Sequence, residues 1–137
     1  MKYLLTAIFA IVLIGLVFTL AVKLQSNFEK PTLLQLFHKG KFNRTTIDFK
    51  TDGTYIFDNA ATELKDFKYG RYQLDGNRIR LDKSELDSVI KTNLLEIQSK
   101  KVAATNETKS YVYQINDKGE ILQNKVVFEV LLDNRKK

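Results

Sequence analysis

The stretch from Phe67 to Leu81, FKYGRYQLDGNRIRL, decides the fold of this chain. Apolar and polar side chains alternate on both sides of Asp75-Gly76, a pair typical of a tight turn between two strands. One face of the predicted hairpin carries Tyr72, Leu74, Ile79 and Leu81. The other face carries Arg71, Gln73, Arg78 and Arg80. The pattern predicts antiparallel strands with one face on a core and the other in water.

The segments on either side of this hairpin continue the same pattern. Residues 45–58 read as a second hairpin around Asp52-Gly53, and a polar loop follows from Asp58 to Asp66. Further strands are predicted at 93–98, 102–105, 110–116 and within 120–132. Seven or eight short strands predict a mainly β domain, an antiparallel meander that closes as a barrel or packs as a sandwich.

Two short helices are predicted within this domain. The first lies between Pro31 and Gly40, which suit the start and end of a helix, with Leu33, Leu36 and Phe37 on one face. The second covers residues 84–92. Its inward face is formed by Leu86, Val89 and Ile90.

The N-terminal segment has a different character. Twenty residues, Tyr3 to Val22, contain no charge and lie between Lys2 and Lys23. As a helix they span about 30 Å, the thickness of the hydrocarbon core of a bilayer. A cleaved signal peptide is the alternative, with a weak cleavage site at residues 19–21, but the apolar run is longer than such segments usually are. We therefore predict a transmembrane anchor at 1–23, a linker at 24–30 and a β-rich soluble domain at 31–137.

The flanking charges leave two orientations open for this single-pass anchor. Lys23, Lys30, Lys39 and Lys41 follow the helix, and the positive-inside rule would keep the domain in the cytoplasm. A two-residue head followed by a long domain is instead typical of a signal-anchor, which places the domain outside. We favour the periplasmic or extracytoplasmic side.

Short motifs carry a resemblance to a known family. They are Gly40-Lys41-Phe42, Asp52-Gly53-Thr54-Tyr55, Gly70-Arg71-Tyr72 and the segment DGNRIRL at 75–81. These motifs resemble those of the lipocalin-like small β-barrel proteins of bacterial envelopes, over roughly residues 33–81, although Phe42 stands where that family has Trp. The resemblance implies a small barrel and a hydrophobic cavity, without a specific ligand.

The composition removes most catalytic chemistry. The chain has no cysteine and one histidine, His38, so cysteine-based catalysis and the common zinc sites built from Cys and His are not available. No glycine-rich phosphate loop occurs among its six glycines. The net charge of +6 is scattered rather than gathered into a stripe, so we expect contact with membrane lipid and not with nucleic acid. We predict a protein that is not an enzyme and has no cofactor or metal.

Two sets of residues are candidates for binding. Tyr69, Tyr72, Tyr111 and Tyr113 could line a cavity or face a partner, or simply fill the core of a barrel. Ala7, Ala10 and Gly15 are small residues that could form a helix-packing face. Two functions follow: a non-catalytic accessory subunit or assembly factor that binds a membrane-protein partner, or a lipocalin-like binder of a lipid or small apolar molecule.

Overall fold

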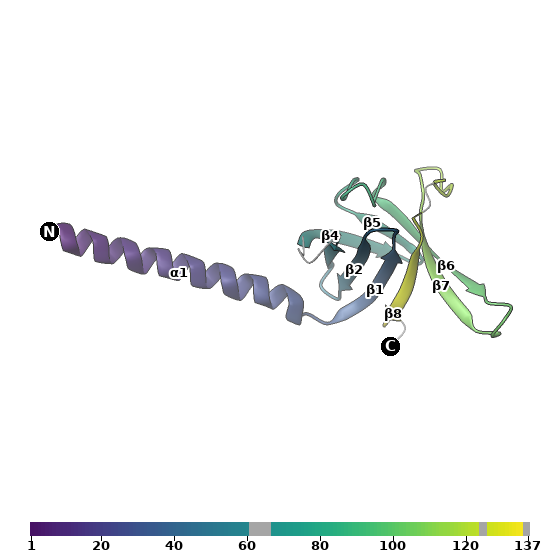
Figure 1. The fold of residues 1–137 in the computed structure, drawn as a ribbon, viewed down its shortest axis with the longest axis horizontal. Helices are drawn as coiled ribbons and strands as arrows, with labels where there is room; N and C mark the ends of the chain where they lie inside the picture. The colour runs from purple at the N-terminus through teal and green to yellow at the C-terminus, as the bar shows by residue number, and fades with distance from the viewer. Residues whose placement is uncertain (61–66, 124–125, 136–137) are drawn as a thin grey trace. The chain divides into compact units, whose positions relative to one another are not determined.

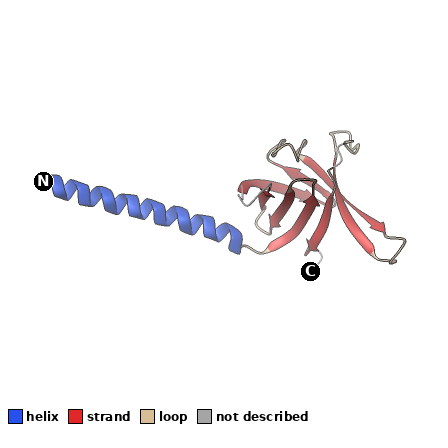
Figure 2. Cartoon of the chain, in the orientation of Figure 1, coloured by secondary structure: helices blue, strands red, loops and turns tan. Residues whose placement is uncertain are grey.

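The fold was determined as a computed structural model, which describes residues 1–60, 67–123 and 126–135, with the backbone alone at 2–5 and 27. The chain forms two compact units, Met1–Pro31 and Thr32–Lys137. The first is a helix and the second is built of strands (Figures 1 and 2).

The first unit is the helix α1, Lys2–Glu29. Its stretch from Thr6 to Ser26 has a mean hydropathy of 2.6, and by length and composition it can cross a membrane, as a signal sequence also can. The hydroxyls of Thr19 and Ser26 donate to backbone carbonyls one turn earlier, each at 2.9 Å. These bonds satisfy the two hydroxyl groups within the helix itself.

The segment predicted as a linker, residues 24–30, is helical as far as Glu29. Residues 24–29 contain no Gly or Pro, and the Gln25 amide donates to the Glu29 carboxylate at 3.0 Å, one turn further on. Pro31 ends the helix because it forces the residue before it out of the helical region. Lys30 accordingly has extended backbone angles, φ −65° and ψ 140°.

The second unit is a closed barrel of eight antiparallel strands in which each strand pairs with the next and β8 pairs with β1. Its strands are β1 Thr32–Lys39, β2 Arg44–Lys50, β3 Thr54–Ala60, β4 Phe67–Asp75, β5 Arg78–Leu81, β6 Leu94–Lys101, β7 Thr108–Gln114 and β8 Phe128–Asp133. The predicted meander is therefore confirmed, and it closes as a barrel (Figure 1).

Both predicted hairpins are present. In β4 and β5, Tyr72 lies opposite Leu81 and Leu74 lies opposite Ile79, so the predicted apolar face points to the interior. Gly53 and Gly76 have φ of 82° and 58° in the two tight turns, a region that suits glycine. The alternation of side chains thus fixed both the strands and their inward face.

Both short helices predicted inside the domain are wrong, and the described residues contain α1 as their one helix. Residues 32–39 form β1, which pairs with β2 on one side and β8 on the other. The loop from Leu86 to Ile90 is instead a tight turn with positive φ at Asp87 and Ser88. Leu86, Val89 and Ile90 are nevertheless buried in the core, as predicted.

The C-terminal strands differ from the prediction in two places. Residues 103–105 form a turn between β6 and β7 instead of a strand, with Asn106 at φ 58°. The last strand, β8, begins only at Phe128. It pairs with β7 at two positions, against four with β1.

Large side chains are buried in the interior of the barrel. The largest fully buried ones are Tyr55, Phe49, Phe57 and Phe128, together with Leu, Ile and Gln side chains from the surrounding strands. Gln114 is buried and its amide donates to the Val89 carbonyl at 2.9 Å while accepting from the Lys91 amide at 2.7 Å. This amide fixes the loop that carries Leu86, Val89 and Ile90 to the core.

Because Gly70 has no side chain, it leaves space for the ring of Tyr55, the largest fully buried side chain. It lies opposite Tyr55 on the inward face, and a Cβ on Gly70 would overlap the Tyr55 ring and the Asp82 carboxylate. With no side chain in the way, the Tyr55 hydroxyl reaches Asp82 and donates to its carboxylate at 3.1 Å. Burial, and then the Asp82 charge, raise the pKa of Tyr55 well above its ordinary value.

Candidate interaction surface

The four candidate tyrosines do not form one site. Tyr72 points into the barrel, where its hydroxyl donates to the Lys50 carbonyl at 2.7 Å and its ring meets Phe49 edge-on at 4.8 Å. Burial, with the Asp52 charge, raises its pKa. Tyr72 is therefore a core residue with a satisfied hydroxyl.

Tyr69, Tyr111 and Tyr113 alternate with inward residues, are half-buried and lie on the outer face. Tyr113 accepts a hydrogen bond from Lys100 Nζ at 2.8 Å, and that ammonium lies 4.9 Å from the centre of its ring. Tyr111 and Tyr113 share β7, whereas Tyr69 lies on β4, with β5 and β6 between these strands in the barrel. The two positions belong to separate parts of the outer surface.

The three small residues of α1 are exposed, but they do not share one face. With 3.6 residues per turn, Ala7 and Ala10 lie about 60° apart, whereas Gly15 lies about 140° from Ala10. Gly15 instead falls on the same side as Thr19 and Ser26, within about 40°. Nothing lies within 4 Å of a Cβ placed on Gly15.

A groove lies at the tip of the hairpin formed by β1 and β2. It is lined by Phe37, Lys39, Gly40, Lys41, Phe42, Asn43, Arg44 and Ala60, and its volume is about 510 Å³. Phe42 is 81% exposed, the most exposed large apolar side chain described in the barrel unit. We call this feature the tip groove.

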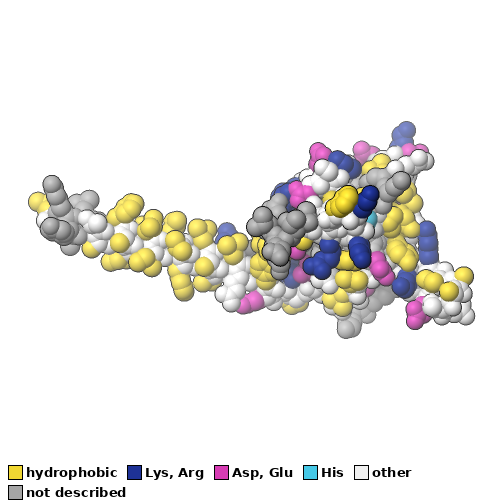
Figure 3. All heavy atoms as spheres, viewed as in Figure 1, with side chains coloured by type: hydrophobic (Ala, Val, Ile, Leu, Met, Phe, Trp, Pro, Cys, Tyr) yellow, Lys and Arg dark blue, Asp and Glu magenta, His cyan; other side chains and the backbone are white. Residues whose placement is uncertain are grey.

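The tip groove is basic. Lys39, Lys41 and Arg44 line it, its described lining residues include no carboxylate, and none of the three cations forms an ion pair with another described residue. Lys39 lies directly opposite Arg44 in the ladder between β1 and β2, an arrangement that is destabilising for like charges. Lys41 Nζ lies 5.2 Å from the centre of the Phe42 ring. Figure 3 shows Lys and Arg side chains beside hydrophobic ones on the barrel.

Hydrogen bonds hold the backbone of the tip in place. The Gly40 amide donates to the Asn43 carbonyl at 2.9 Å. The Asn43 amide side chain and the Thr45 hydroxyl both donate to Asn59 Oδ1, at 2.9 and 3.0 Å. A Cβ on Gly40 would overlap the Asn43 side chain, so this close turn depends on glycine.

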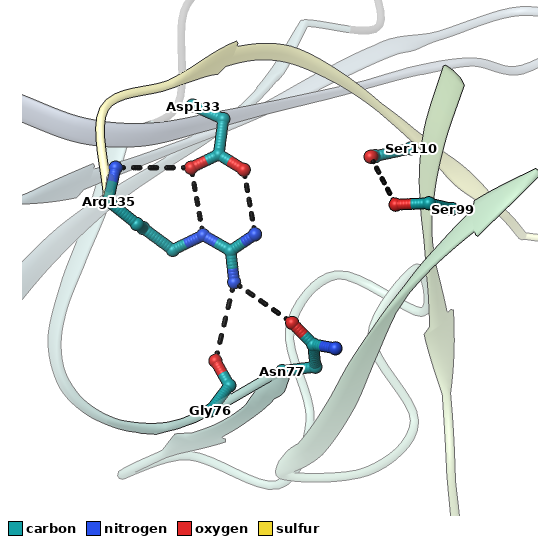
Figure 4. Close-up of polar contacts among 6 residues, drawn as sticks. All are labelled: Gly76, Asn77, Ser99, Ser110, Asp133 and Arg135. Atoms are coloured by element: carbon teal, nitrogen blue, oxygen red, sulfur yellow. Dashed lines mark hydrogen bonds and ion pairs between the residues drawn. The ribbon is translucent and has the colours of Figure 1, made fainter. Parts of the chain in front are cut away.

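The C-terminal end is held by a second polar cluster (Figure 4). The Arg135 guanidinium donates to both carboxylate oxygens of Asp133, at 2.8 and 2.7 Å, and to the Gly76 carbonyl at 3.3 Å. The Asp133 bonds raise the pKa of Arg135. Because every partner is part of the barrel, we assign this cluster a structural role.

The one histidine of the chain has structural contacts in the barrel. His38 lies in β1, where its Nδ1 lies 2.8 Å from the Val127 carbonyl and its ring packs at 5.7 Å on Phe128. Among the residues whose side chains are described, no three or more His, Asp or Glu side chains come together as a metal site would require. The tip groove is therefore the strongest candidate for binding.

Sequence reasoning did not identify the tip groove. It used Gly40-Lys41-Phe42 for the family resemblance and placed those residues after a helix. The run Lys39-Gly40-Lys41-Phe42-Asn43-Arg44, three cations around one aromatic residue in a turn, was the signal that could have revealed it.

No family model matches this chain, and no curated protein and no solved structure matches it either. The eight-stranded antiparallel barrel is consistent with the lipocalin-like resemblance at the level of fold.

Proposed function

We propose that this chain is a non-catalytic, membrane-anchored interaction protein, an accessory subunit or assembly factor of a membrane complex. The observation that carries the proposal is the pairing of an apolar helix, exposed from Thr6 to Ser26, with a barrel whose interior holds a core of large buried side chains. A barrel packed in this way binds through its outer surface, and an anchored one meets its partners at the membrane.

The helix supports a retained anchor. Its apolar stretch matches the bilayer core in length, and large Ile, Leu, Val and Phe side chains are exposed all around it. Ala21, the last residue of the weak cleavage site, lies inside a helix that continues to Glu29. Only Lys30 and Pro31 separate α1 from β1, which keeps the barrel at the membrane surface. We place the barrel on the periplasmic or extracytoplasmic side.

The interior of the barrel argues for a protein partner over a lipid ligand. A small-molecule site of ordinary size needs several hundred Å³ of enclosed space. Large side chains, Tyr55, Phe49, Phe57 and Phe128 among them, fill the centre of this barrel. A lipocalin-like binder would have to displace them. The strand order of the barrel supports the proposed likeness to the lipocalin-like family. The motif Gly40-Lys41-Phe42 lies in the turn between β1 and β2, and not after a helix as the resemblance had assumed.

The experiment that tests the proposal is purification of the full-length protein from its native host in a mild detergent. All components that elute in fixed ratio are then identified, and the intact mass shows whether the helix is retained. A defined set of membrane proteins supports an accessory subunit. An isolated protein, or one that has lost its first twenty or so residues, would contradict the proposal.

A pair of substitutions tests the role of the helix. Gly15→Leu adds a bulky side chain to the face shared with Thr19 and Ser26, and it should reduce co-elution of the partner if that face packs against another helix. Ala10→Leu is the matched control, because it lies about 140° away on the same helix. Equal effects of the two substitutions would remove this helix face from the argument.

Orientation can be read directly because the chain contains no cysteine. Lys118→Cys places a single thiol on an exposed turn between β7 and β8. In intact cells of the native host, a maleimide reagent that cannot cross the inner membrane should label this thiol if the barrel is extracytoplasmic. Labelling only after lysis would show that the barrel is cytoplasmic.

A further inference from the structure

We propose that the tip groove binds a short acidic segment of a partner protein, in which a carboxylate stands next to an apolar side chain. The inference rests on the proposed function and names the chemistry of the partner. Three features of the groove support the inference. Its cations form no ion pair with the described residues, the aromatic side chain of Phe42 is exposed, and hydrogen bonds hold the backbone of the turn in place.

The charge of the tip groove has no partner in the described residues. Three exposed cations elsewhere on the barrel form ion pairs: Arg78 with Glu96, Lys91 with Glu85 and Lys109 with Glu129. The nearest described carboxylates do not neutralise the groove. Glu129 lies opposite Phe37 but contacts Lys109, and Asp58 lies opposite Thr46 without an ion pair to Arg44. Carboxylates of a partner would relieve the repulsion between Lys39 and Arg44.

Phe42 supplies the apolar part of the site. At 81% exposure it remains in water in the free protein, and an interface would remove most of that surface from water. Phe37 and Ala60 line the same groove, so an apolar side chain of the partner would contact these residues as well as Phe42. Aromatic residues, Phe included, and Arg are enriched at the cores of protein interfaces.

The fixed backbone of the tip reduces the entropic cost of binding. Asn59 accepts hydrogen bonds from Asn43 and Thr45, and the Gly40 amide bonds to the Asn43 carbonyl. The turn that presents Lys41 and Phe42 is therefore ordered before a partner arrives. The outer tyrosines do not gather at one place in this way, because Tyr111 and Tyr113 lie on β7 and Tyr69 lies on β4.

The first test identifies what touches position 42 in native membranes. The photo-reactive amino acid p-benzoylphenylalanine replaces Phe42 in the full-length protein, and Leu131, another exposed apolar residue, is replaced in the control. After irradiation, the attached peptide is sequenced. The expected result is a segment with Asp or Glu beside an apolar attachment point, captured from position 42 and not from 131. Attachment to lipid, or to a segment without carboxylates, would overturn the inference.

The second test measures the contact with the segment so identified, as a fluorescent synthetic peptide. The full-length protein is held in nanodiscs of phosphatidylcholine, which carry no net charge. Phe42→Ala should weaken binding by about thirtyfold or more and Arg44→Glu by at least about tenfold. Leu131→Ala and Lys101→Glu, exposed and outside the groove, should change it less than about twofold. A peptide with Lys in place of its acids should regain affinity for Arg44→Glu.

The remaining outcomes separate this inference from the proposed function. If Phe42→Ala and Arg44→Glu leave partner co-elution unchanged, the groove is not the docking site, while the accessory-subunit proposal stands. If these substitutions alter only association with phosphatidylglycerol vesicles, the occupant is a lipid surface and the inference fails. If the unaltered protein elutes without any partner, the proposed function fails and the inference fails with it.

Discussion

The substitution Gly70→Ala tests the packing of the core most directly, and we expect it to destabilise the barrel. The new methyl group would point inward, opposite Tyr55, and would overlap the Tyr55 ring. Tyr55 is fully buried, so its ring has little space into which it can move. The displaced hydroxyl would also lose its bond to Asp82.

The cost is the sum of three terms. Overpacking of a filled core costs about 1–3 kcal/mol. Loss of the hydroxyl bond costs about 1 kcal/mol more. Replacing glycine by alanine returns about 0.4–1 kcal/mol through the unfolded chain, and the φ of Gly70 lies outside the left-handed region, so no backbone strain is added. We expect a net loss of about 2–3 kcal/mol in the free energy of unfolding.

The assay is urea unfolding of residues 32–137, the compact unit that contains the barrel. With a slope of about 1.5–2 kcal/mol per molar, the midpoint should fall by about 1–2 M. The double variant Gly70→Ala with Tyr55→Leu removes the ring that is displaced, so its loss should be smaller than the sum of the two single losses by at least about 1 kcal/mol. Additive losses, or a single loss below about 0.5 kcal/mol, would refute the reasoning.

Three further predictions use the same barrel. Lys39→Thr removes the repulsion from Arg44, so the free energy of unfolding should rise by about 0.2–1 kcal/mol in urea, while a fall would contradict it. The raised pKa of Tyr55 means that the unfolded chain ionises first, so stability falls by up to about 1.4 kcal/mol per unit as the pH rises above about 10. Tyr55→Phe should remove that part of the loss in urea midpoints measured across this pH range. Gln114→Leu leaves the Val89 carbonyl without its bond and should cost about 1–3 kcal/mol, with faster hydrogen exchange confined to the neighbouring loop as its signature.

Much of the barrel could be predicted because its hairpins carry local information. In 67–81 the alternation of side chains and the turn at Asp75-Gly76 agree, so strand, turn and inward face followed together. The buried triplet Leu86, Val89 and Ile90 was also predicted correctly, although as a helix. Whether a residue is buried depends largely on its apolar character, which can be read from the sequence. Whether its segment forms a helix, a strand or a turn depends also on contacts with segments that are distant in the sequence.

The error at β1 shows this dependence clearly. Leu33, Leu36 and Phe37 fit a helical stripe, yet Leu34 and Leu36 are the residues buried on the inward face of a strand. Both patterns were present in one short segment. Pairing with β8, about a hundred residues later in the chain, decided between them, and no local window contains that strand.

The candidate surface was less predictable than the fold. Tyr72 and Tyr111 have the same side chain in the same kind of strand, yet one fills the core and the other faces outward. Register, set by neighbouring strands, makes that difference. The tip groove depends on Lys39 and Arg44 facing each other across a hairpin, and this was hidden once the segment had been assigned to a helix.

The pairing of β1 with β8 also sets an order of events during synthesis. The apolar helix leaves the ribosome first and can enter the membrane while the barrel is still being made. β1 then waits for a partner strand that begins 96 residues later, at Phe128, which at about 5–20 residues per second is about 5–20 s. Throughout that interval the edge of β1 that pairs with β8 is open. The proposed anchor would thus be in place before the barrel is folded, and the six-residue strand β8 decides when the edge of β1 is protected.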